Sequence, residues 1–286
     1  RTPMTRSTET SGLLGDTAAR DYSRKLTQFN AFAGPELRQL IAGLELKPGM
    51  HVLDAGCGTG DALKWLRAEV GADGSVTGID LAAAHTSAAR ATAPADTLVV
   101  QADLLRPPLA SDSLDLIWSV NTVNHLHDPV AGVRTLAGLL RPGGRIALGQ
   151  SSLLPDMYFA WDARLERVAN EAVRQYYRDR YQVSERDLTA VRSIVGLLQR
   201  SGLRDVTVRT VVIERTWPLR PADEDYLLET IFRNTWGERL RPYLSGEDFE
   251  ELTRLCDPAQ PDFALRRPDF HFLQSFTLAV GMVGMR

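Results

Sequence analysis

Residues 52–60, which read Val-Leu-Asp-Ala-Gly-Cys-Gly-Thr-Gly, constrain the fold of this chain more than any other stretch. Apolar and small residues lead into three alternating glycines, and a helical pattern follows with Leu63, Leu66 and Val70 on one face. Glycine is required where a turn adopts dihedrals that other residues avoid, or where the backbone approaches a ligand closely. The stretch therefore predicts a strand, a tight turn and a helix whose first N–H groups face a bound molecule.

The glycine spacing and two acidic residues indicate which ligand this turn binds. Dinucleotide-binding turns read Gly-x-Gly-x-x-Gly and hold a pyrophosphate, whereas the third glycine comes one residue earlier in this chain. Asp54 precedes the first glycine, where a carboxylate would repel a phosphate but suits a cationic ligand. A second apolar run, 76–79, ends in Asp80, where a carboxylate can accept hydrogen bonds from both hydroxyls of a ribose. An NAD-dependent oxidoreductase is therefore disfavoured.

Residues 54–60 together with Asp80 resemble motif I and the acidic end of the second strand in class I S-adenosylmethionine-dependent methyltransferases. The resemblance is close over 35–150, and the His-Leu step at 125–126 is similar to the ubiquinone/menaquinone-biosynthesis type and to bacterial secondary-metabolite methyltransferases. It implies that S-adenosyl-L-methionine is the cofactor, with Asp103 bonding the exocyclic amine of adenine and Leu104 donating its backbone N–H to the ring. The full set of cofactor contacts that it implies is Tyr22, Asp54, Gly56, Gly58, Thr59, Gly60, Asp80, Leu81, Asp103, Leu104 and Asn121.

Apolar runs and helical patterns alternate along the rest of the chain and predict an α/β fold. Polar helices are expected over 11–32 and 36–46, separated by a break at Gly34-Pro35. Further strands are expected at 98–100, 114–120, 145–149, 206–213 and 271–283. With the resemblance, these elements imply a Rossmann-like doubly wound seven-stranded sheet with an antiparallel last strand, plus helical lid insertions.

The order of elements divides the chain into core segments and additions. Tyr22 and Phe29 lie on an N-terminal segment that resembles a lid over the cofactor, and a core helix is expected from Ser184 to about Arg200. The expected units are an N-terminal lid with a disordered start at 1–34, a cofactor-binding core at 35–150, a helical insertion at 151–183, a core helix and strand at 184–214, a second helical insertion at 215–268, and a final strand at 269–286.

Large aromatic and apolar side chains gather in the two insertions. They either line a pocket for an apolar substrate, form the core of the insertions or make a subunit contact in a homo-oligomer. We expect a small, largely apolar metabolite, such as a natural product or a lipid-like molecule. The side chains are Met157, Tyr158, Phe159, Trp161, Tyr176, Tyr177, Tyr181, Trp217, Tyr226, Phe232, Trp236 and Tyr243.

The reaction that the resemblance implies is in-line displacement of the sulfonium methyl group by a nucleophile of the acceptor. The protein must align that nucleophile and exclude water, and it needs a general base only where a hydroxyl has to lose its proton. His125 is the first candidate for this base and Tyr22 the second, while a structural or cofactor-edge histidine is the alternative for His125. Carbon, oxygen and nitrogen acceptors stay open. No metal is expected, because His125 and His127 are not accompanied in the sequence by carboxylate or cysteine residues that could complete a metal site.

Composition narrows the partners and the compartment. A net charge of −3 gives no basic excess for a nucleic acid partner. No apolar run approaches the roughly 20 residues that span a bilayer, so no membrane span is expected. Two cysteines, Cys57 and Cys256, are far apart and favour a cytoplasmic protein without a disulfide framework.

A second class of function remains open for this sequence. The fold and cofactor site are also compatible with a protein that binds S-adenosylmethionine and catalyses a cyclisation, or that is not catalytic. The complete motif at 54–60 argues only weakly against this alternative. The appearance of a methylated product would separate the two classes.

Overall fold

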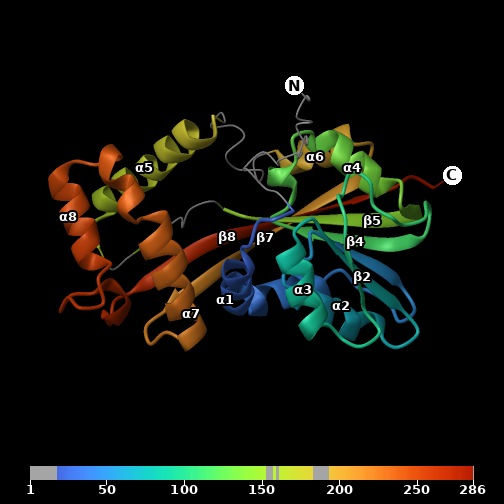
Figure 1. Cartoon of the computed structure of the whole chain (residues 1–286), viewed down its shortest axis with the longest axis horizontal. Coiled ribbons are helices and arrows are strands. Elements are labelled where there is room, and N and C mark those ends of the chain that lie inside the picture. Colours follow the sequence, from blue (N-terminus) through green and yellow to red (C-terminus); the bar gives the residue numbers. More distant parts are fainter. Residues whose placement is uncertain (1–17, 153–156, 159–160, 183–192, 286) are drawn as a thin grey trace, which may run out of the picture.

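The computed structural model describes residues 18–152, 157–158, 161–182 and 193–285, whose arrangement is shown in Figure 1. Within these ranges one sheet follows the order β3-β2-β1-β4-β5-β8, and β7 and the two-residue β6 also pair with β8. Strands β1 to β5 are parallel, whereas β8 runs antiparallel to β5 and β7. The predicted doubly wound sheet with an antiparallel last strand is confirmed. Its strands are β1 (His51–Ala55), β2 (Ser75–Asp80), β3 (Leu98–Gln101), β4 (Leu114–Val120), β5 (Leu140–Ser151), β6 (Met157–Tyr158), β7 (Arg204–Thr216) and β8 (His271–Met282).

Helices cover both faces of the sheet, and alternate strand residues face opposite layers. Val52 belongs to the apolar cluster that includes residues of α1, α2 and α3, whereas Leu53 belongs to the cluster with α4 and α6. The helices are α1 (Ser23–Ala42), α2 (Asp61–Val70), α3 (Ala83–Thr92), α4 (Pro129–Ala137), α5 (Ala163–Tyr181), α6 (Ile194–Arg200), α7 (Pro221–Tyr226) and α8 (Gly246–Leu255), with the π-helix η3 (Leu227–Thr235) and the 3-10 turns η1 (Val123–His125), η4 (Glu238–Tyr243) and η5 (Ala264–Arg266). None of the helices in the described ranges is long and apolar enough to cross a bilayer.

Helix α1 runs through Pro35 without interruption. The expected break at Gly34-Pro35 and the separate helix at 36–46 are therefore wrong. Apolar residues on both sides of the proline are buried in one continuous cluster, and this packing outweighs the backbone hydrogen bond that proline cannot donate. The buried residues of this stretch are Phe32, Ala33, Leu37, Leu40 and Ile41.

Other boundaries also differ from the sequence prediction. Met157 and Tyr158 form β6 rather than the start of a helix, because their backbone pairs with Phe272 and Leu273 of β8. The core helix expected from Ser184 begins in a stretch, 183–192, that lies outside the described residues, and α6 is its described part.

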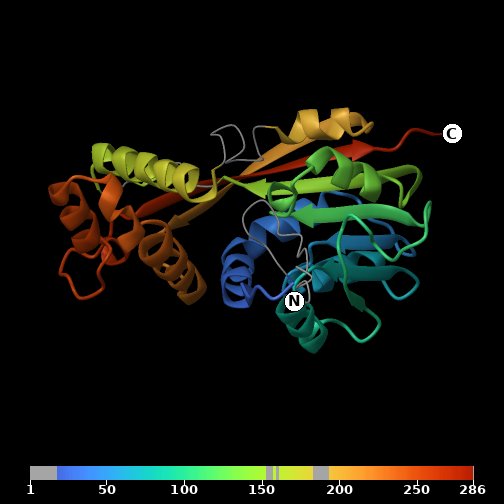
Figure 2. The same cartoon turned by 45° about the horizontal axis from the view of Figure 1, so that its top comes forward.

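A helical unit, consisting of α5, α7, η3, η4, α8 and η5, lies beyond one end of the sheet (Figures 1 and 2). Most aromatic side chains of the expected insertions form the core of this unit. The ring of Trp161 lies 5.7 Å from that of Phe232 and 5.1 Å from that of Trp236, and Phe232 packs edge-on against Phe263. The indole N–H of Trp236 donates to Oδ1 of the buried Asn170 at 3.2 Å. These rings therefore stabilise the unit itself.

A buried ion network joins the helical unit to α1. Arg215 of β7 is 9% exposed, and its Nε donates to Oδ1 of Asp223 at 2.9 Å. Its Nη1 donates to Oε1 of Glu36 at 2.7 Å, and its Nη2 donates to the Phe32 carbonyl one turn before Pro35. Burial alone would raise the pKa of Asp223, but hydrogen bonds from Arg220 and Arg215 lower it. Arg215 thus holds β7, α7 and α1 together.

We expect Arg215→Met to lower the free energy of unfolding by about 1.5–3 kcal/mol, because the half-buried Glu36 loses its partner and the buried Asp223 keeps only Arg220. The measurement is chemical denaturation followed by circular dichroism. Arg241→Met is the matched control, since Arg241 pairs with Glu238 on the surface and should cause no measurable change. Equal stability of the two variants would contradict a structural role for the network.

Candidate active site

A cavity of about 690 Å³ lies at the carboxyl ends of the parallel strands β1, β2 and β4, the position where open α/β sheets bind ligands. It collects most of the residues that the sequence predicts for the cofactor. Tyr22, Asp54, Gly56, Gly58, Asp80, Leu81, Asp103, Leu104, Asn121 and His125 all line it. Thr59 and Gly60 do not line it. Gly60 is the N-cap residue of α2, and the buried Thr59 donates its hydroxyl to Oδ2 of Asp61 at 3.0 Å.

The glycine turn brings the chain close to the neighbouring strands. The N–H groups of Gly56 and Cys57 both donate to the Ile79 carbonyl at 2.8 and 2.9 Å. Gly56 has a φ of +81°, and a Cβ there would collide with the side chain of Thr122. Gly58 has a φ of +52°, and a Cβ would lie 2.9 Å from Leu26 of α1. Both positions therefore require glycine for conformation and for space.

Asp80 is held at the end of β2 by three hydrogen-bond donors. Its Oδ2 accepts from the backbone N–H of Gly58 at 2.9 Å. Its Oδ1 accepts from the backbone N–H of Ala82 at 2.9 Å and lies 3.0 Å from Nδ1 of His85. These contacts use three of the roughly four lone-pair sites of the carboxylate and fix its plane at the cavity wall, where a ribose hydroxyl can reach the site that is left.

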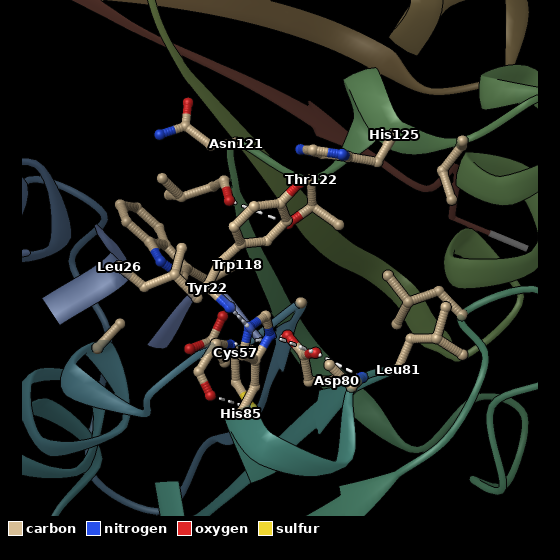
Figure 3. Close-up of a pocket in the computed structure, with 18 of the residues that line it drawn as sticks. Tyr22, Leu26, Cys57, Asp80, Leu81, His85, Trp118, Asn121, Thr122 and His125 are labelled. Atoms are coloured by element: carbon tan, nitrogen blue, oxygen red, sulfur yellow. Dashed lines mark hydrogen bonds and ion pairs between the residues drawn. The ribbon is translucent and has the colours of Figure 1, made fainter. Parts of the chain in front are cut away.

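His85 is a site residue that the sequence analysis did not identify. It is 7% exposed on α3, and its Nε2 accepts the backbone N–H of Tyr22 at 2.9 Å (Figure 3). In the neutral imidazole, Nδ1 therefore carries the proton and donates to Asp80. The residue lies in an alanine-rich helix whose pattern alone gives no reason to place this side chain at the cavity. His85 therefore connects the N-terminal end of α1 to the carboxylate of Asp80.

Asp54 is the most perturbed acid of the cavity. It is 3% exposed, and burial, followed by the negative charges of Asp80 and Asp61, raises the pKa of Asp54 to about 8. A buried carboxylate beside other carboxylates is costly unless a positive charge joins it. The site is therefore suited to a ligand with a sulfonium or an ammonium group, as the sequence predicts.

Other walls of the cavity come from distant elements that the motif does not contain. The side chains of Leu26 and Phe29 on α1, Trp65 on α2 and Trp118 on β4 line it. Trp118 is 1% exposed and three residues before Asn121, so its position in β4 could have indicated this role. Asp103 lines the cavity with Oδ1 accepting the backbone N–H of Leu105 at 2.9 Å.

Asn121 and His125 line both this cavity and a smaller adjoining one of about 210 Å³. Asn121 has a left-handed φ of +51°, and its Oδ1 accepts hydrogen bonds from the N–H of Ser151 at 2.9 Å and from its hydroxyl at 3.1 Å. His125 ends the short turn η1, where its N–H donates to the Thr122 carbonyl at 3.0 Å. Figure 3 shows both side chains on the same side of the cavity. The boundary between the two cavities is therefore built by the segment after β4.

Comparison with known proteins connects this geometry to a family. Residues 53–148 match the family model described as a methyltransferase domain. Methyltransferase GfsG of Streptomyces halstedii is 29% identical over 215 residues, which cover 70% of this chain and 72% of that protein. The 27-O-demethylrifamycin SV methyltransferase of Amycolatopsis mediterranei is 33% identical over 129 residues, which cover 43% of this chain and 47% of that protein. The chain thus aligns with about half the length of the second relative.

Solved structures show the same fold. The YcgJ protein of Bacillus subtilis matches with a TM-score of 0.53 and 15% sequence identity, over 90% of this chain and 100% of that chain. A likeness at this identity concerns the fold alone. The matched family region contains the end of β1, the glycine turn, Asp80 and the Asn121 to His125 segment, so it includes the wall where the two cavities meet.

The raised pKa of Asp54 predicts pH-dependent cofactor binding. In the folded, ligand-free protein Asp54 keeps its proton up to about pH 8, whereas an unfolded chain releases it near pH 4. Rising pH between these values therefore destabilises the ligand-free protein, and a bound cation favours the ionised form. We expect affinity for S-adenosylmethionine to increase by up to about tenfold per pH unit below pH 8.

Calorimetry at neutral pH in two buffers of different ionisation enthalpy measures the proton released on binding. We expect about one proton per bound S-adenosylmethionine, since Asp54 is mostly protonated beforehand. Asp54→Asn is the control, because an amide has the same shape and no proton to release. Equal proton release by the wild type and this variant would show that another group titrates.

Proposed function

We propose that this chain, which belongs to the class I S-adenosylmethionine-dependent methyltransferases, transfers a methyl group to a hydroxyl oxygen of a small natural-product metabolite. The chain is a methyltransferase that acts on small molecules, and S-adenosyl-L-methionine is its cofactor. The observation that carries the proposal is the pair of adjoining cavities with His125 on the wall of both. One cavity has the carboxylates for a cationic cofactor, and the other has room for the acceptor.

The residues of the larger cavity fit the cofactor. Asp80 is positioned for ribose hydroxyls, and Asp54 is positioned for a positive group. Asp103 and Leu104 lie on the wall where the adenine ring is expected. When bound, S-adenosyl-L-methionine supplies a methyl group activated by a cationic sulfur, which keeps the electron pair of the broken C–S bond.

The protein orients the acceptor and receives its proton. The acceptor oxygen forms the new O–C bond, and the hydroxyl proton passes to the imidazole of His125, which returns it to solvent after product release. The apolar wall formed by Phe29, Trp65 and Trp118 excludes water from the cavity. Tyr22, the second candidate for the base, donates its backbone N–H to His85 and presents its ring beside the imidazole at 6.3 Å. Tyr22 therefore lies beside His85 and Asp80, on the part of the wall that fits the cofactor, and we assign proton transfer to His125.

Two findings favour oxygen over an aliphatic amine nitrogen as the acceptor atom. Lys25 lines the smaller cavity, and no Asp or Glu is among the described residues that line it, so a cationic amine would meet a like charge without a partner. One relative is named for methylation of 27-O-demethylrifamycin SV. The natural-product class is likewise supported by the names of such relatives, whereas the aromatic side chains mostly form the core of the helical unit.

Mass spectrometry tests the proposed reaction. The purified protein is incubated with S-adenosylmethionine and a panel of hydroxylated polyketide and quinone metabolites, and products are searched for the mass of one added methylene unit. Isotope-labelled methyl donor identifies the transferred carbon, and each acceptor with its hydroxyl already methylated is the matched control. Cofactor binding without any methylated product would favour the cyclisation or non-catalytic alternative.

His125→Asn tests the proton acceptor in this reaction. Asparagine keeps a polar side chain but cannot accept the proton, so we expect turnover to fall by about 100-fold or more and the acid limb of the pH–rate profile to disappear. Affinity for S-adenosylhomocysteine should stay close to that of the wild type. A small loss of turnover with the same pH profile would assign His125 to positioning of the cofactor or the acceptor.

A further inference from the structure

The smaller cavity lies between the sheet and the helical unit, and its polar lining is unlike that of the cofactor site. Gln150 and Gln274 reach it from β5 and β8, and Asn124 reaches it from η1. The π-helix η3 contributes Thr230 and Asn234. π-Helical turns are rare and are often found at functional sites. The core and the added helices therefore build this cavity together.

Four oxygen atoms on the side chains that line this cavity are buried and have no hydrogen-bond partner in the described structure. They are Oε1 of Gln150, Oε1 of Gln274, Oδ1 of Asn124 and Oγ1 of Thr230. Gln150 is 6% exposed and Gln274 is 2% exposed. Buried polar atoms are normally paired, because an unmade hydrogen bond is costly. All four side chains line the same cavity, where a ligand that donates hydrogen bonds would satisfy these oxygens once the side chains turn toward it.

The amide of Gln274 has a defined orientation. Its Nε2 donates to the Ser152 carbonyl at 3.0 Å. Burial raises the pKa of the neighbouring Tyr226 hydroxyl, and a hydrogen bond with the Gln274 side chain partly offsets this effect. Because the amino group is engaged in this way, the oxygen of Gln274 is the atom left to accept a donor from the cavity.

The charge around the cavity excludes a cationic donor. Lys25 lines the cavity, and no Asp or Glu is among the described residues of its wall. Burial, followed by repulsion from Arg239 and Arg20, lowers the pKa of Lys25, so the surroundings already disfavour positive charge. An ammonium group would add to this repulsion, whereas neutral O–H groups can donate to the four oxygens without it.

We propose that this cavity is the acceptor subsite and that it binds a neutral, hydroxyl-rich part of the acceptor, such as a pyranose ring or a polyol segment, through Gln150, Gln274, Asn124 and Thr230. This inference rests on the proposed methyl transfer and specifies its substrate class. A volume of about 210 Å³ equals the space of about seven water molecules in the liquid, which is enough for one sugar-sized ring. The bound hydroxyl nearest to His125 is the one that receives the methyl group.

Binding of matched fragments tests the subsite without knowledge of the natural acceptor. Saturation-transfer NMR on the protein loaded with S-adenosylhomocysteine compares methyl α-D-glucopyranoside with its fully O-methylated derivative, which has no O–H donor. We expect signals from the first fragment and binding of the second that is weaker by about tenfold or more. No binding of the pyranoside, or equal binding of both fragments, would overturn the proposal.

Two variants locate this binding in the smaller cavity. Gln150→Met and Thr230→Val keep the side-chain size and remove one acceptor oxygen each, so both should weaken pyranoside binding while affinity for S-adenosylhomocysteine stays within about twofold of the wild type. Gln199→Met, an exposed amide on α6, is the matched control and should change neither. Thermal unfolding identifies any variant that does not fold. If one of the two variants does not fold, pyranoside binding by the other variant tests the proposal. Unchanged pyranoside binding in a folded variant would contradict the assignment.

The outcomes separate this inference from the proposed function. If the wild type does not bind S-adenosylhomocysteine, or if no methylated product forms, the proposed methyl transfer itself is contradicted. Normal cofactor binding with methylation of acceptors that lack further hydroxyls would leave the methyl transfer intact and overturn only the hydroxyl-rich subsite.

Discussion

The burial of the Asp54 carboxylate beside Asp80 is the constraint on which the functional site depends. Burial, followed by the negative charges of Asp80 and Asp61, raises the pKa of Asp54 to about 8, so the ligand-free site holds a proton where a cation is expected. Gly56 and Gly58 leave room for the side chains of Thr122 and Leu26, and Gly58 donates its N–H to Asp80. The glycine turn, Asp54 and Asp80 together therefore favour a positive ligand over a phosphate.

Helix α1 connects this site to the rest of the molecule. At its N-terminal end, the N–H of Tyr22 donates to His85, which in turn contacts Asp80. In its middle, the Phe32 carbonyl accepts a hydrogen bond from Arg215, which also binds Asp223 of α7. Movement of α1 would therefore change the cofactor wall and the junction with the helical unit together. Lys25, between these two contacts, lines the smaller cavity.

The two cavities are built by different parts of the chain. The larger cavity lies almost entirely within the matched family region together with α1. The smaller one takes Gln150 and Gln274 from the sheet and Thr230 from the π-helix, so much of its polar lining comes from residues outside the matched family region. The smaller cavity therefore carries the proposed acceptor subsite, and the larger cavity carries the residues that fit the cofactor.

Local pattern in the sequence predicted the strands and the glycine turn, because neighbouring residues specify both. The resemblance of the motif to a family implied the antiparallel last strand and most of the residues at the cofactor wall. Tertiary packing decided the rest. Burial on both sides of Pro35 kept α1 continuous, and His85 meets the backbone N–H of Tyr22, 63 positions earlier, only because α1 packs beside α3. The polar cavity combines β5, β8 and η3, and 124 positions separate Gln150 from Gln274, so no local pattern could show that their unpaired oxygens meet.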